Sequence, residues 1–254
     1  SCSDPTGDAG NRCAIKSDIS GVSLVDPELV PDPASAEDAL LEYLKAAGYF
    51  DDGLVESEGW VETLCDANRA ILPENVKVTC ASLQNRSEDG SLTPIAFTDK
   101  QCHETKKFLE DPRCFALLAW RGYEDGKPST DHMVHLRAMV CSDEIPSDEG
   151  GEGEKETSGS VEDISADTAS AANPQPHRIV YDDPAYLPGD PLLGLIYPDS
   201  PEMRRDPRST LLELHLTGRY TEVNLLSLFY KCIDPLPDQH ILVTEPNPDD
   251  RIQR

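Results

Sequence analysis

The first clear hydrophobic pattern along the chain is that of an amphipathic helix. Leu40, Leu41 and Leu44 recur at the three- and four-residue spacing of one helical face, and the pattern stops at Gly48. Ser35 stands before this run and is typical of a helix N-cap. We therefore expect a helix from Ser35 to about Gly48.

Two further helices are indicated before the middle of the chain. The segment from Ser57 to Ile71 ends before a proline and places four less polar or amide side chains on one side: Trp60, Leu64, Cys65 and Asn68. Thr98 is followed three residues later by Gln101, which is the capping-box pattern. A helix from Asp99 to about Glu110 is therefore expected.

Period-two alternation predicts strands between these helices. Val76, Val78 and Cys80 alternate with polar residues, as in a half-buried strand. The run from Leu92 to Phe97 is a second strand, and Pro94 places it at an edge of the sheet because proline cannot donate to a ladder.

The segment from Cys114 to Cys141 predicts a β-hairpin. Two strand-like runs flank the polar stretch 124–130, and we centre the loop between Lys127 and Pro128. In that register one apolar face is shared by Phe115, Leu117 and Ala119 with Val134, Leu136, Ala138 and Val140. The same register sets Cys114 opposite Cys141, where a cross-strand disulfide is one option.

The last third of the chain predicts short strands and one helix. Strands are expected at 177–181, 192–197 and 241–244, with a longer alternating strand at 212–216. Thr221 is expected to cap a helix whose less polar residues are Leu225, Leu226, Leu228, Phe229 and Cys232.

These elements divide the chain into four portions. Residues 1–34 are rich in Pro, Asp, Gly and Ser and are expected to form an extended arm, and 35–141 form a first α+β portion. Residues 142–176 hold ten acidic side chains and no aromatic residue, so we expect a disordered acidic insertion. Residues 177–254 form a second α+β portion, in one structural unit with 35–141. The fold class is α+β, with a disulfide-stabilised antiparallel sheet and several short helices.

The eight cysteines indicate an oxidising compartment. They are even in number, scattered, and without a Cys-x-x-Cys pair that would suggest a zinc or redox site. The alternative is a set of buried free thiols in a reducing compartment. The disulfide candidates are Cys2, Cys13, Cys65, Cys80, Cys102, Cys114, Cys141 and Cys232.

The amino-terminal residues offer a second indication of export. Ser1-Cys2-Ser3-Asp4 and the polar stretch after it resemble, over about ten residues, the start of a mature bacterial lipoprotein. That resemblance implies lipidation of Cys2 and attachment to a cell surface, whereas the alternative places Cys2 in a disulfide. The sequence Asn85-Arg86-Ser87 fits a glycosylation acceptor at Asn85. The sequence has no stretch of about 18 apolar residues, so no membrane span is expected.

The charge balance narrows the class of partner. Asp and Glu number 48 against 22 Lys and Arg, which gives a formal charge of −26. Such a chain is a poor nucleic-acid binder, because that affinity depends on basic side chains that neutralise phosphates. It also has no electrostatic attraction to anionic lipid. The expected partner is a protein or another extracellular molecule.

Few residues suggest catalysis. Glu213 and His215 share one face of the expected strand 212–216 and are the weak candidates for a general base, although the solvated face of a strand looks the same. His132 and His135 have a helical metal-site spacing but lie on an expected strand, which sends them to opposite faces. We expect His135 to face Trp120 at the surface. No metal or cofactor is expected.

Charged clusters give no stronger signal. Acidic pairs at 51–52, 182–183 and 249–250 lack the ligand spacing of an EF-hand, and solvated surface is the better interpretation. One basic cluster contains Arg204, Arg205 and Arg208. It is either a locally balanced loop or a contact for an anionic partner.

The sequence therefore predicts an exported binding or interaction protein, at a cell surface or in an extracellular assembly. Export chemistry is visible in the cysteines, whereas no catalytic motif is present, so an enzyme is less expected. Two alternatives remain: a secreted hydrolase with an unrecognised acid–base site, and a structural subunit of a surface assembly.

Overall fold

The computed structural model describes residues 12–49, 59–145, 177–184, 192–196 and 222–235. Within them lies one seven-stranded sheet in the order β2-β1-β7-β3-β4-β5-β6, in which every neighbouring pair is antiparallel. The strands are β1 (Val76–Arg86), β2 (Leu92–Thr93), β3 (Cys114–Glu124), β4 (Lys127–Val140), β5 (His177–Asp182), β6 (Leu192–Ile196) and β7 (Glu222–Pro235). The α-helices are α1 (Arg12–Val25), α2 (Pro33–Ala46), α3 (Trp60–Ile71) and α4 (Asp99–Leu109). The predicted α+β class, with an antiparallel sheet and disulfides, is confirmed.

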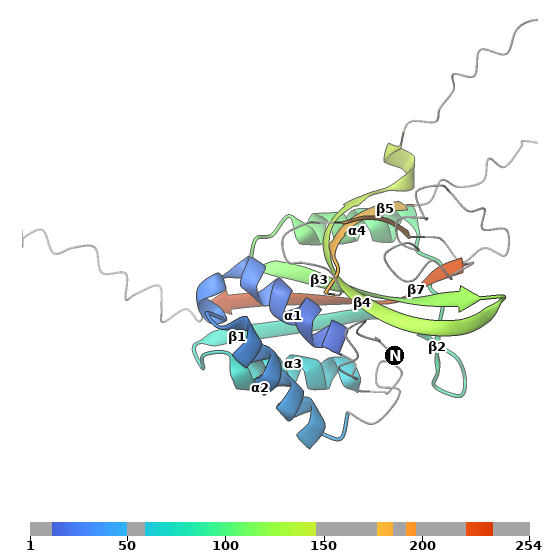
Figure 1. Ribbon diagram of the computed structural model, residues 1–254. Helices are drawn as coiled ribbons and strands as arrows, with labels where there is room; N and C mark the ends of the chain where they lie inside the picture. The colour runs from blue at the N-terminus through green and yellow to red at the C-terminus, as the bar shows by residue number, and fades with distance from the viewer. Residues whose placement is uncertain (1–11, 50–58, 146–176, 185–191, 197–221, 236–254) are drawn as a thin grey trace, which may run out of the picture.

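Helices cover both faces of the sheet (Figure 1). On one face, which we call the three-helix face, α1 packs on β3 and β4, α3 packs on β1, and α2 packs on the other two helices. On the opposite face, the α4 face, α4 packs on β3 and β4. Since both faces of the central strands are buried, successive residues of β3 enter opposite cores: Phe115 and Leu117 one, Ala116 and Leu118 the other.

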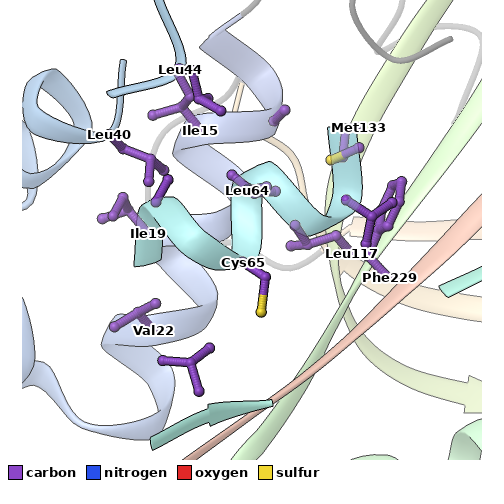
Figure 2. Close-up of a cluster of buried hydrophobic side chains, with 14 of the residues drawn as sticks. Ile15, Ile19, Val22, Leu40, Leu44, Leu64, Cys65, Leu117, Met133 and Phe229 are labelled. Carbon is purple, nitrogen blue, oxygen red and sulfur yellow. The ribbon is translucent and has the colours of Figure 1, made fainter. Parts of the chain in front are cut away.

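The core of the three-helix face brings together residues from distant parts of the chain (Figure 2). Its labelled members are Ile15, Ile19, Val22, Leu40, Leu44, Leu64, Cys65, Leu117, Met133 and Phe229, and all are at most 2 % exposed. The helical faces predicted for α2 and α3 point into this core, because Leu40, Leu44 and Leu64 are buried in it. These two helical faces are confirmed.

Helix α1 lies within residues 1–34, where an extended arm was expected. Residues 12–25 are helical, and Ile15, Ile19 and Val22 are buried. The expectation of an arm was wrong for these residues, because the helix also buries Ser17, Asp18 and Gly21, which look like surface or loop positions in the sequence. Buried polar positions of this kind break the apolar period on which sequence reasoning depends.

The helix caps follow local sequence signals. Thr98 and Gln101 form the predicted capping box, with each side chain bonded to the other residue's backbone N–H, and α4 follows it. At α2 the N-cap is Asp32, not Ser35. Its carboxylate accepts from the Ser35 N–H, and Pro33 occupies the first helical position.

The hairpin of β3 and β4 has a different register from the expected one. Its turn is Asp125-Gly126, where φ is 50° and 74°, and Glu124 pairs with Lys127. Positive φ at both central residues is what a two-residue type I′ turn requires, and Asp-Gly is its usual sequence. The strand pairing therefore differs from the expected register by three residues. A shift by an odd number moves side chains to the other face of the sheet, so Val134 and Leu136 lie on the α4 face. The expected register was wrong.

Strand β7 stands where a helix was expected. The run from Val223 to Phe229 is buried throughout, because β7 lies in the middle of the sheet between β1 and β3. A run that is buried on both faces has no apolar period to distinguish a buried helix from a central strand. The helix beginning at Thr221 was wrong for this reason.

Three disulfides have both cysteines within the described residues. Cys65–Cys80 links α3 to β1, Cys102–Cys141 links α4 to the residue after β4, and Cys114–Cys232 links β3 to β7. Cys13 is also disulfide-bonded, to a partner outside the described residues. The cross-strand option between Cys114 and Cys141 was wrong, since Cys114 is in register with Cys232 and Cys141 lies over α4.

The remaining strands agree with expectation in kind and differ in length. β1 and β5 cover the predicted segments, β6 covers Leu192–Ile196 of the predicted 192–197, and β2 has two residues of the predicted 92–97 at the edge of the sheet. Residues 142–144 form a short 3-10 helix instead of the start of a disordered insertion. The rest of that insertion and the strands expected at 212–216 and 241–244 lie outside the described residues. Among the described helices, none has the length and hydropathy needed to span a membrane.

Candidate functional site

A charged and amide cluster lies at the centre of the three-helix face. Lys231 of β7 points between α1 and α3, where its Nζ donates to Asp18 Oδ1 and, at 2.5 Å, to Asn68 Oδ1. Asn68 Nδ2 in turn donates to Asp18 Oδ2 at 2.5 Å. The three side chains therefore form a closed ring of hydrogen bonds, which we call the Lys–Asp–Asn cluster.

The Lys–Asp–Asn cluster is sealed from solvent. Lys231 and Asn68 are 1 % exposed and Asp18 is 0 % exposed. The ring centroid of Phe115 lies 6.0 Å from Lys231 Nζ, and Phe229 and Ile233 flank the lysine on the same face of β7. Burial lowers the pKa of Lys231 below its ordinary value of 10.5, because desolvation disfavours the ammonium, although the charge of Asp18 opposes this effect.

His135 of β4 lies on the same face, against Phe115, and its contacts resemble a catalytic triad only in composition. Its Nδ1 is 3.1 Å from Ser20 Oγ and 3.4 Å from Asp182 Oδ2. A triad needs the serine and the carboxylate on different ring nitrogens, so that a proton can pass across the imidazole. Here both are on Nδ1, and Nε2 is buried without a hydrogen-bond partner among the described residues. We therefore interpret this contact as a structural one between α1 and β4.

His132 lies on the opposite face of β4, as strand geometry predicts. Its Nε2 is 2.9 Å from Asp183 Oδ1. Its ring packs edge-on against Trp120, with 5.3 Å between the ring centroids. Trp120 pairs with His132, not with His135 as expected, and the pair is buried instead of exposed. The three-residue shift of the hairpin register explains this correction.

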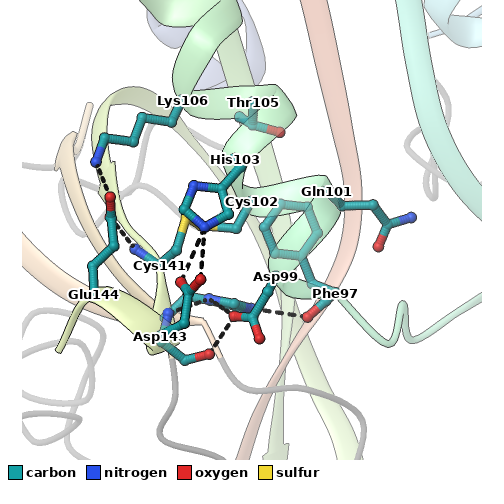
Figure 3. Close-up of a disulfide and its surroundings, with 12 residues drawn as sticks. Phe97, Asp99, Gln101, Cys102, His103, Thr105, Lys106, Cys141, Asp143 and Glu144 are labelled. Atoms are coloured by element: carbon teal, nitrogen blue, oxygen red, sulfur yellow. Dashed lines mark hydrogen bonds and ion pairs between the residues drawn. A yellow bond between two sulfur atoms is a disulfide. The ribbon is translucent and has the colours of Figure 1, made fainter.

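A third group of titratable residues surrounds the Cys102–Cys141 disulfide (Figure 3). His103 Nε2 is 2.9 Å from Asp143, and Lys106 donates to Glu144 at 2.6 Å. The hydrogen bond to Asp143 raises the pKa of His103 above its ordinary 6.5. These exposed pairs hold the 3-10 helix of residues 142–144 against α4.

His177 contributes buried contacts to the same group. Its Nε2 donates to the carbonyl of Phe97 at 2.9 Å, and its Nδ1 accepts from the Ser142 N–H at 3.0 Å. Two sets of potential metal ligands meet here, and both include Cys141. Since the sulfur of Cys141 is bonded to Cys102, it is not a free thiolate ligand in the oxidised protein.

The residues suggested by the sequence fall in different places. Asn85 is exposed on β1, as a glycosylation acceptor must be, and its Nδ2 is 3.4 Å from the carbonyl of Pro94. One acidic pair, Asp182 and Asp183, lies within the described residues. Asp182 contacts His135 and Arg137, and Asp183 contacts His132. Four sets of residues lie outside the described residues: Glu213 with His215, the arginines at 204, 205 and 208, Cys2, and the acidic pairs 51–52 and 249–250.

Sequence reasoning missed the Lys–Asp–Asn cluster. Its members come from three elements separated by 50 and 163 residues, so no local spacing relates them. One local signal was available: Lys231 is the only lysine after position 176, and it stands inside an apolar run. A lysine in such a run needs an acidic partner, because an unpaired buried charge is very costly.

Comparisons of this chain with protein-family models, with curated proteins and with solved structures found no match.

Proposed function

We propose that this is an exported protein with a binding or interaction role, at a cell surface or in an extracellular assembly. The observation that supports it best is the disulfide framework. All seven cysteines of the described residues are disulfide-bonded, and the three pairs with both partners described link α3, α4 and β3 to other elements. Disulfides persist in oxidising compartments and are rare in the cytosol.

Binding is favoured over hydrolysis by the contacts of the four described histidines. None of them has a hydroxyl group on one ring nitrogen and a carboxylate on the other among the contacts of the described residues. They hold secondary structure elements together instead. The charge of −26 favours a partner whose surface is positively charged, because complementary charges steer association.

Thiol trapping in the producing cells tests export. Cells are quenched in acid and alkylated before lysis, and the protein is mapped by mass spectrometry. We expect no alkylated cysteine and recovery of the protein from the extracytoplasmic fraction. Alkylation of all eight cysteines in a cytosolic fraction would contradict the proposal.

Binding to intact producing cells tests the interaction role. We expect saturable binding of the labelled protein, competition by unlabelled protein, and weakening as the salt concentration rises, because salt screens exposed charges. Reduced and alkylated protein is the matched control and should not bind. Equal, non-saturable attachment of both forms would contradict a specific interaction.

A further inference from the structure

The Lys–Asp–Asn cluster contains the groups needed to form an amide bond between two side chains. Lys231 supplies an amine, Asn68 supplies a carboxamide carbon, and Asp18 supplies a carboxylate that contacts both nitrogen atoms. An amine and a carboxamide do not react readily in water. Held together in a fixed geometry with an acid–base group, they gain a large advantage in effective concentration.

The environment favours the reactive form of the amine. The cluster is enclosed by the apolar core of the three-helix face, and its members are at most 1 % exposed. Desolvation disfavours ionic forms, so transfer of a proton from the Lys231 ammonium to the Asp18 carboxylate gives a neutral pair. The neutral Nζ then has a lone pair for attack. Lysines activated by desolvation are known nucleophiles.

Asp18 is placed to move protons between the two nitrogens. Its Oδ1 accepts from Lys231 Nζ, the attacking atom, and its Oδ2 accepts from Asn68 Nδ2, the leaving atom. A carboxylate that contacts both atoms can take a proton from the first and deliver one to the second. Asn68 Oδ1, 2.5 Å from Nζ, is the oxygen on which negative charge develops during attack.

From this arrangement we propose that Lys231 and Asn68 become joined by an intramolecular isopeptide bond, with Asp18 as the acid–base catalyst. The Nζ lone pair forms a bond to Asn68 Cγ, and the bond from Cγ to Nδ2 breaks. Asp18 receives the ammonium proton, gives a proton to Nδ2 and takes one from Nζ. The products are one secondary amide, one ammonia molecule and a protonated Asp18. No oxidant or other co-reactant is required.

The bond would connect α3 to β7 and so join the two parts of the chain on either side of residues 146–176. It would also replace a buried ionic pair, whose desolvation is costly, by a neutral amide. The inference does not depend on the proposed binding role, since the reaction uses only groups inside the fold.

A cleavage experiment tests the bond. A recognition sequence for a site-specific protease is inserted within residues 146–176 of the full chain, and the protein is cleaved, fully reduced and run on a denaturing gel. The fragment with Asn68 and the fragment with Lys231 should remain joined after reduction. Intact reduced protein should be lighter than its sequence mass by one ammonia molecule.

Each outcome decides the proposal. Joined fragments with loss of ammonia support it, and a cross-linked peptide containing Asn68 and Lys231 identifies the bond. Separated fragments at full sequence mass show an ordinary buried ion pair and overturn it. Loss of one water molecule places the bond between Lys231 and Asp18 and overturns the assignment to Asn68. Loss of ammonia with separated fragments shows a change at an asparagine alone and also overturns it.

Variants then assign the roles. Asn68→Ala removes the reacting carbon and should abolish the link, and Asp18→Asn keeps the shape of the catalyst but removes its acid–base function. Both should give separated fragments after reduction, with the disulfides of the unreduced protein still formed as evidence of folding. Lys77→Met changes an exposed lysine on neighbouring β1 and should leave the link intact.

Discussion

The helices of the two faces are attached to the sheet by different kinds of contact. On the three-helix face, α1 and α3 meet β7 through the buried groups of Asp18, Asn68 and Lys231. On the α4 face, α4 meets β7 through Thr105, whose hydroxyl lies 2.7 Å from Tyr230 OH, and through an edge-on contact of Phe108 with the Tyr230 ring. The charged groups of α4 pair at its exposed rim.

This difference shows how each helix is positioned. An apolar contact tolerates small shifts, whereas a closed ring of buried hydrogen bonds holds only in one arrangement. The Lys–Asp–Asn cluster therefore fixes α1, a helix of modest hydrophobicity, on the sheet. Helix α4 is positioned by its contacts with Tyr230, its disulfide and its rim pairs.

The largest effect is expected from Lys231→Met, which leaves Asp18 buried without a cation. Removing one partner of a buried ion pair costs about 3–5 kcal/mol, because the other charged group stays buried without its partner. Denaturant unfolding measures the change in the free energy of unfolding. Lys77→Met, on the exposed side of β1, is the control and should change it by less than about 0.5 kcal/mol. Equal effects of the two variants would contradict the comparison between the faces.

The second largest effect is expected from the disulfides, because each face has one disulfide that ties a helix to the sheet or to the residue after a strand. The separation is 39 residues for Cys102–Cys141 and 15 for Cys65–Cys80. Loop-closure entropy then predicts losses of about 4 and about 3 kcal/mol for the two double alanine variants. Thermal unfolding of both variants checks the order. A smaller loss at Cys102–Cys141 would show that α4 is held mainly by its other contacts.

A third prediction concerns the close approach of α1 to β3. A Cβ added at Gly21 would lie 2.1 Å from a ring carbon of Phe115, which is buried. Replacing glycine by alanine inside a helix usually stabilises it by about 1 kcal/mol. Here Gly21→Ala should destabilise the protein by about 1–3 kcal/mol, because the core is overpacked. Chemical denaturation measures the sign, and Phe115→Leu in the same chain should recover part of the loss.

The smallest effect is expected at the rim of α4. The hydrogen bond to Asp143 raises the pKa of His103 above 6.5, so its contribution is fully present below pH 6.5 and is lost as the pH rises through the raised value. The pKa of Asp143 is lowered by the same bond, so its contribution is lost only at strongly acidic pH. His103→Gln should therefore lower the melting temperature slightly at mildly acidic pH and not at alkaline pH. An NMR titration of His103 reads the pKa directly, and a value at or below 6.5 would contradict the pairing.

Signals that lie within a few residues predicted structure well. The capping box of Thr98 and Gln101 and the helical spacing of Leu40 and Leu44 were sufficient, because each depends only on neighbouring residues. The Asp125-Gly126 turn is also a local signal, but the expected register centred the loop between Lys127 and Pro128 and drew its support from the apolar pattern of the two strands. That pattern could not determine the register, since both faces of β3 are buried.

Long-range contacts were not predictable in the same way. Helix α1 looks polar because Ser17, Asp18 and Gly21 meet partners far along the chain, and β7 has no period because it lies in the middle of the sheet. The pairing of Cys114 with Cys232 depends on that central position of β7. The corrections at β7 and at Cys114 therefore have one physical origin, which is that β7 is buried on both faces in the middle of the sheet.

Disulfide mapping after cleavage tests the central position of β7 most directly. Oxidised protein is cut within residues 146–176 and digested, and the linked peptides are identified without reduction. We expect one peptide that joins Cys114 to Cys232 and another that joins Cys102 to Cys141. A peptide that joins Cys114 to Cys141 would contradict both the place of β7 and the register of the hairpin.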